Sequence, residues 1–131
     1  MSLTWTRLNT YKLHFPKRLT VTDIVSDETL SKALKYLAET DQDCARAKGL
    51  YDGLEDQTKT VSGILYLQMP TGTTVAEKEA RVCASETYID HKKKVNDSFI
   101  EYETMRNKRS TAVIITDVWR TAQANKRAGN I

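Results

Sequence analysis

The sequence predicts an all-α fold, a long antiparallel helical hairpin with a short connecting helix. Apolar residues recur at steps of three, four and seven through two long stretches, which is the spacing of one face of a helix. Only five glycines and two prolines occur in 131 residues, and both prolines stand outside the periodic stretches. Two long helices joined by a compact connection are expected to fold back on each other.

The first long helix is expected to begin near Ser26. Ser26 can cap the helix, and Val25 can pack onto Leu30 as a hydrophobic staple. Gly49 and Gly53 lie inside this helix and mark either a bend or a place where another helix comes close. The apolar residues that keep its period are Leu30, Ala33, Leu34, Leu37, Cys44, Ala47, Tyr51, Leu54, Val61, Ile64 and Leu65.

A short connecting helix is expected over residues 75–84. Pro70 ends the first helix, and Thr74 with Glu77 then forms a Thr-x-x-Glu capping box. Ser85 follows as either a break or a kink before the next helix.

The stretch from Ser85 to Arg127 reads as one long amphipathic helix. Ser85 can cap its start, and Glu86 lies in the first turn, where the helix dipole favours an acid. Its apolar stripe consists of Val95, Phe99, Tyr102, Met105, Ala112, Ile115, Trp119 and Ala122. Because such a helix cannot bury this stripe alone, the chain must supply a partner.

Residues 1–22 look least helical and are expected to form an N-terminal arm, with the helical domain occupying 23–131. Tyr11, Leu13 and Phe15 alternate with polar residues, which is the period of a strand. A short edge strand, an arm that packs on another subunit, and a disordered tail all agree with this pattern.

Further apolar residues lie off the seam that a single hairpin would bury. They are Tyr66, Tyr88, Ile89, Ile100 and Ile114. This surplus predicts a homo-oligomer in which helices of different copies share a core.

The composition indicates a soluble cytoplasmic protein. No apolar run approaches the ~20 residues that span a bilayer, and the N-terminus lacks the apolar region of a secretory signal. Cys44 and Cys83 are therefore expected to stay reduced and to pack as small apolar residues.

No catalytic, metal or cofactor site is assembled by the sequence. His14 and His91 are the only histidines, and we expect His91 to be solvated beside Lys92, Lys93 and Lys94. No nucleophile is paired with a base, and there is no glycine-rich phosphate loop. We therefore expect no enzymatic activity.

Charge is unevenly distributed along the chain. Residues 1–22 carry four bases and no acid, residues 23–69 carry five bases and nine acids, and residues 70–131 carry eleven bases and eight acids. The three segments thus have net charges of +4, −4 and +3. This pattern favours either an internal match between segments or a basic face for an acidic partner such as nucleic acid.

The basic residues near the C-terminus are the candidate nucleic-acid contacts. They are Arg106, Lys108, Arg109, Arg120, Lys126 and Arg127, against the single acid Asp117. The helix dipole accounts for Lys126 and Arg127, but not for the cluster at 106–109. Aromatic residues interleave with these bases, as in surfaces that stack bases, yet they belong to the stripe that we expect to be buried.

Several short sequence segments resemble those of a known family. They are Tyr36-Leu-Ala-Glu-Thr-Asp41, Thr74-Val-Ala-Glu-Lys-Glu-Ala80, Tyr102-Glu-Thr-Met-Arg-Asn-Lys-Arg109, Trp119-Arg120 and Ala124-Asn-Lys-Arg-Ala-Gly-Asn-Ile131. From Leu30 onward the chain resembles a family of small helical tailed-phage proteins of unassigned function, encoded near single-strand annealing and single-strand-binding genes.

The resemblance implies a non-catalytic phage accessory protein of DNA metabolism or recombination in the cytoplasm of the infected host. It would contact single-stranded DNA or a phage recombination protein through its basic helix face. The alternative is a structural or interaction protein whose helical oligomer scaffolds or inhibits a protein partner and never binds DNA.

Overall fold

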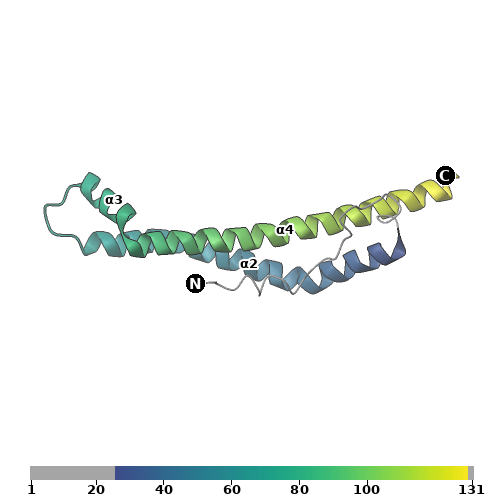
Figure 1. Ribbon diagram of the computed structural model, residues 1–131, viewed down its shortest axis with the longest axis horizontal. Helices are drawn as coiled ribbons and strands as arrows, with labels where there is room; N and C mark the ends of the chain where they lie inside the picture. The colour runs from purple at the N-terminus through teal and green to yellow at the C-terminus, as the bar shows by residue number, and fades with distance from the viewer. Residues whose placement is uncertain (1–25, 130–131) are drawn as a thin grey trace. The chain divides into compact units, whose positions relative to one another are not determined.

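The computed structural model describes residues 26–129, and over this range the chain forms three helices and no strand (Figure 1). Helix α2 spans Asp27–Leu67, α3 spans Val75–Ala84 and α4 spans Glu86–Arg127. The two long helices form a helical hairpin, and α3 lies in the connection between them. The prediction of an all-α hairpin with a short connecting helix is therefore confirmed. The predicted arm at 1–22 and the staple from Val25 lie outside the described residues.

The start of α2 has the cap that the sequence predicts. The Ser26 hydroxyl accepts a hydrogen bond from the backbone N–H of Thr29 at 3.2 Å. Asp27 and Glu28 occupy the first turn, where the exposed N–H groups favour negative charge.

The start of α3 is a complete capping box. Thr74 Oγ1 accepts from the backbone N–H of Glu77 at 3.2 Å, and Glu77 Oε2 accepts from the backbone N–H of Thr74 at 3.4 Å. Two backbone donors that a helix start leaves without partners are thus satisfied by one pair of side chains.

Ser85 separates α3 from α4 as a break. Its φ of −68° and ψ of 132° are extended, so the helical ladder stops there and α4 begins at Glu86. In the loop that precedes α3, Gly72 has a φ of 94°, a left-handed conformation that favours glycine.

The chain divides into two compact units. Unit 1 contains α2 up to Asp41 and α4 from Arg106 onward, and unit 2 contains Gln42–Met105. Both long helices contribute a segment to each unit.

The core of unit 1 is small and contains two alanines. The buried residues are Ala33, Tyr36, Ala112 and Ile115, with Leu37 packed against them. Ala33 and Ala112 are completely buried, and their short side chains permit a close approach of the two helix backbones. Large flanking side chains such as Ile115 then supply most of the apolar area removed from water.

The core of unit 2 combines apolar, aromatic and polar side chains. Ala47, Val82 and Val95 are its buried apolar residues, and Val82 anchors α3. Two polar residues of α4, His91 and Ser98, are buried with them. The Ser98 hydroxyl is satisfied by the carbonyl of Val95 at 2.8 Å.

The buried face is narrower than the apolar stripes that the sequence predicts. Leu34 and Ile64 were expected to face the partner helix, and each leaves about half of its surface exposed, at 48% and 52%. Phe99 is also exposed, at 41%. In a two-helix packing only the residues between the helices are covered, so flanking members of each stripe stay in contact with water.

Gly49 and Gly53 of α2 are not explained by contacts within the described part of the chain. A Cβ atom built on Gly49 or on Gly53 meets nothing within 4 Å. The expectation that another helix comes close at these positions is therefore not met by any helix within residues 26–129.

Among the helices of residues 26–129, none combines the length and the apolar character needed to cross a membrane.

Candidate nucleic-acid interface

The C-terminal part of α4, in unit 1, has the strongest charge imbalance of the described chain. Between Arg106 and Gly129 there are six bases and one acid, which gives a net charge of +5. This segment contains all six of the candidate contact residues.

Three of the six bases share one edge of α4. Arg106, Arg120 and Arg127 are separated by fourteen and seven residues, which returns each side chain to nearly the same side of the helix. All three are exposed. At about 1.5 Å per residue they extend over roughly 30 Å of helix. We call these three residues the arginine edge.

An acid lies beside the arginine edge and pairs with one member of it. Asp117 Oδ1 lies 3.8 Å from Nη1 of Arg120, and both side chains are mostly exposed. Exposed pairs of this kind contribute only about 0 to 1 kcal/mol and exchange readily with other charged groups. Arg120 can therefore still bind a phosphate despite its pairing with Asp117.

Two of the remaining bases lie away from the arginine edge. Lys108 is half-buried. It follows Arg106 by two residues, so the two side chains leave α4 in nearly opposite directions and do not share a face. Lys126 is exposed in the last turn of α4, where its charge suits the helix dipole.

Arg109 is bound to α2. Its Nη1 donates to the carbonyl oxygen of Leu37 and to Oγ1 of Thr40, both at 2.8 Å, and its Nη2 donates to Asp41 at 3.2 Å. Thr40 is only 1% exposed, and its hydroxyl in turn donates to the carbonyl of Tyr36 at 2.7 Å. This network gives a physical reason for a base in the middle of α4, where the dipole offers none.

The structure therefore does not bring the six candidate residues together on one surface. A nucleic-acid role for Arg109 stays a prediction, but its guanidinium is largely occupied by α2. The arginine edge with Lys126 is the part of the set that faces solvent.

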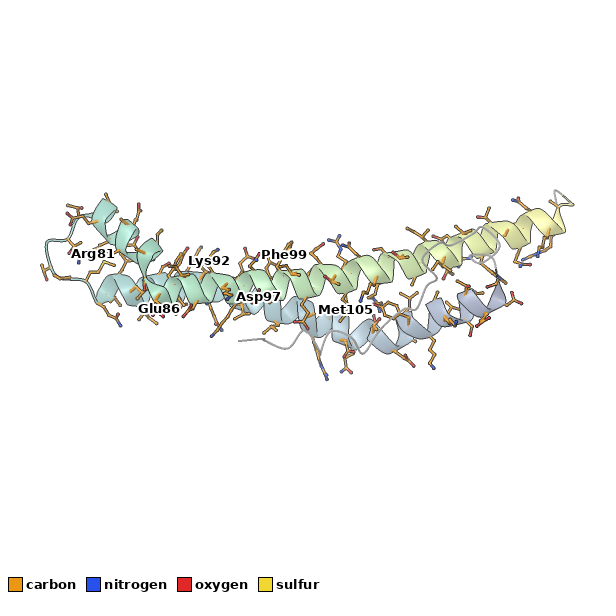
Figure 2. The ribbon with its side chains drawn as sticks, viewed as in Figure 1. Arg81, Glu86, Lys92, Asp97, Phe99 and Met105 are labelled. Atoms are coloured by element: carbon orange, nitrogen blue, oxygen red, sulfur yellow. The ribbon has the colours of Figure 1, made fainter. Side chains whose placement is uncertain are left out.

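The aromatic residues near the bases take part in the packing of α2 against α4. Trp119 Nε1 donates to Asp27 at 3.0 Å within unit 1. In unit 2 the ring of Tyr51 lies 5.2 Å from that of Phe99 in a tilted arrangement and 6.5 Å from that of Tyr102 in a stacked one. Such ring pairs add about 1 kcal/mol beyond their buried area. Phe99 keeps an exposed edge on α4 (Figure 2).

The expectation that His91 is solvated is wrong. His91 is 8% exposed, and its Nε2 lies 3.0 Å from Oγ1 of Thr58 on α2. The sequence contained a signal for this position, because His91 continues the stripe of Val95 backward by four residues. Extending the buried stripe of α4 to include polar residues would have predicted that His91 is buried.

Only one of the two cysteines agrees with the expectation that both pack as small apolar residues. Cys44 is half-buried, in agreement with it, whereas Cys83 on α3 is exposed. Both thiols are free.

Two tyrosines of unit 2 are held in their protonated form. A hydrogen bond to Glu55, followed by burial, raises the pKa of Tyr51. Burial, followed by the charge of Glu79, raises the pKa of Tyr66. A phenol whose pKa is raised gives up its proton less readily, so neither tyrosine supplies a phenolate base at neutral pH.

Across residues 26–129, no group of three or more His, Cys, Asp or Glu side chains is placed to hold a metal ion.

Comparison with known proteins identifies no relative. No protein-family model matches the chain, and neither a curated protein nor a solved structure matches it. The resemblance to small phage proteins therefore stays a prediction.

Proposed function

We propose that this protein is a non-catalytic accessory of phage DNA metabolism or recombination, acting in the cytoplasm of the infected host. It contacts single-stranded DNA, or a recombination protein bound to DNA, through the arginine edge of α4. The observation that carries this proposal is the charge of +5 between Arg106 and Gly129, with three exposed arginines in line on one edge.

Arginine suits this role because its guanidinium presents a planar fork of donors to a phosphate. Contacts to phosphates position a protein on nucleic acid without selecting a sequence. The available aromatic rings are engaged with α2, so the proposed binding is electrostatic and depends strongly on salt.

The test is fluorescence anisotropy with labelled single-stranded and double-stranded oligonucleotides at two salt concentrations. The variant Arg106→Ala/Arg120→Ala/Arg127→Ala removes the edge. The matched control, Lys92→Ala/Lys93→Ala/Lys94→Ala, removes the same charge from an exposed cluster in unit 2.

Loss of three phosphate contacts on a single strand should reduce the slope of log affinity against log salt by about 2. The lysine control should retain most of the affinity. Equal losses in the two variants would contradict a localised edge, and no binding at low salt would remove nucleic acid as the partner.

A second candidate function rests on a different observation. Ten large apolar side chains of the described chain are between 41% and 88% exposed. Exposed apolar surface on this scale fits a protein whose helical oligomer scaffolds or inhibits a protein partner without touching DNA. Capture of one partner by the wild-type chain in infected cells, together with no oligonucleotide binding, would favour this second function.

A further inference from the structure

One face of α2 in unit 2 has the pattern of a second helix-packing surface. Six residues follow one another at steps of three, four, three, four and three, and every one of them is exposed. They are Leu50, Gly53, Gln57, Thr60, Ile64 and Leu67. We call them the outer stripe.

The outer stripe is distinct from the residues that face α4. The buried side of α2 in this unit runs through Ala47, Tyr51 and Thr58, which contact α4. Leu50, Ile64 and Leu67 are exposed at 54%, 52% and 88%. Steps of three and four are the spacing with which one helix packs along another, so this stripe fits a second helix that residues 26–129 do not supply.

The outer stripe carries no charge. The charged residues between Leu50 and Leu67 all fall outside the stripe, and they are Asp52, Glu55, Asp56 and Lys59. A helix face that meets water alone has no reason to exclude charge in this way. Exclusion of charge together with exposed leucine and isoleucine is typical of the centre of an interface.

Gly53 adds an independent observation. Glycine weakens a helix relative to alanine, and a Cβ at this position would meet no atom of the described residues within 4 Å. The hairpin therefore gives no reason for a glycine there. A residue without a side chain leaves room for a large side chain of a helix packed on the stripe.

The stripe is complementary to itself when two copies run antiparallel. Leu50 then lies opposite Leu67 of the second copy, and Gly53 lies opposite Ile64 of the second copy. Gln57 lies opposite Thr60, which places a polar pair at the centre of the contact, where such pairs set register. A parallel arrangement would instead place Gly53 opposite Gly53 and leave a void.

We infer that the partner of the outer stripe is a second copy of this chain, packed antiparallel through α2. This inference defines a surface for the self-association on which the second candidate function rests, and it holds whether or not the arginine edge binds DNA. The stripe covers roughly 26 Å of helix, so the contact is small and the dimer is expected to dissociate in the micromolar range.

The first experiment is sedimentation velocity over a range of micromolar concentrations. The wild-type chain should approach twice its mass of 14.9 kDa. Ile64→Asp and Gly53→Leu should each raise the dissociation constant by about tenfold or more. Ile89→Asp is the matched control, because Ile89 is 52% exposed, as Ile64 is, but lies on α4.

Neither Ile64→Asp nor Gly53→Leu should unfold the hairpin, because Ile64 is half exposed and leucine favours helix over glycine. Circular dichroism checks this directly. A monomer at every concentration would overturn the inference and the oligomeric function together. A dimer that survives both substitutions would overturn the inference alone and leave self-association in place.

The second experiment tests orientation by disulfide formation in a Cys83→Ser background. Leu50→Cys and Leu67→Cys chains should cross-link to each other when mixed, and neither should cross-link to itself, because identical positions lie roughly 26 Å apart in the antiparallel pair. Self-cross-linking of Leu50→Cys would establish the parallel arrangement and overturn the inferred one.

Discussion

Replacement of Arg109 by methionine is expected to destabilise the protein much more than replacement of other arginines of α4. Methionine keeps much of the aliphatic volume but removes all hydrogen bonds. The two bonds at 2.8 Å, to Leu37 and Thr40, end on atoms shielded from water, since Thr40 is only 1% exposed.

The expected loss can be worked from these contacts. Hydrogen bonds from a charged donor contribute about 1.5 to 3 kcal/mol, and the substitution leaves the Thr40 hydroxyl without its donor. The bond to Asp41 adds less than about 1 kcal/mol, because Asp41 is 83% exposed. We therefore expect the free energy of unfolding to fall by about 2 to 3 kcal/mol.

Urea denaturation measures this loss. Trp119 lies in unit 1, so its fluorescence in a Trp5→Phe background reports on the unit that contains Arg109. With a slope of about 2 kcal/mol per molar urea, the midpoint should fall by about 1 M. Arg120→Met is the control and should change stability by no more than about 0.5 kcal/mol.

A double-mutant cycle with Thr40→Val tests the cause. Arg109 and Thr40 share a hydrogen bond, so the loss in the double variant should be smaller than the sum of the single losses. Additive losses, or an Arg109→Met variant as stable as Arg120→Met, would show that this network does not stabilise the hairpin.

Three further predictions follow from other contacts. The hydrogen bond to Glu55 raises the pKa of Tyr51 in the folded protein. The stability that this bond contributes is therefore complete below about pH 10 and is lost as the pH rises through the folded pKa. In thermal melts from about pH 9 to 11, the melting temperature of Tyr51→Phe should fall less steeply with pH than that of the wild-type chain. Thr58→Val should cost about 1 to 2 kcal/mol, because the buried His91 loses its partner at 3.0 Å, and an unchanged urea midpoint would contradict this. Thr74→Ala should cost about 1 kcal/mol through loss of the capping box and should speed amide exchange in α3, whereas unchanged exchange would argue against the cap.

Local signals in the sequence were sufficient to place the helices. The caps at Ser26 and Thr74 were predicted from residue types alone, and the structure has both. A cap acts on backbone groups within three or four residues, so the information it needs lies in the adjacent sequence.

The candidate contact residues were only partly predictable. Their clustering near the C-terminus is visible in the sequence itself. Helical spacing then places three of them, Arg106, Arg120 and Arg127, on one edge of the helix. The role of Arg109 did not follow, because its partners Leu37 and Thr40 are some seventy residues away along the chain.

The sequence by itself determined where the helices begin and end and that two of them pair. Only the tertiary structure decided which side chains the pairing covers. His91 proved to be buried, while Leu34 and Ile64 stayed exposed. The physical reason is that periodicity identifies the apolar sides of a helix, whereas burial depends on which of those sides a partner occupies, and a single partner helix covers only one of them.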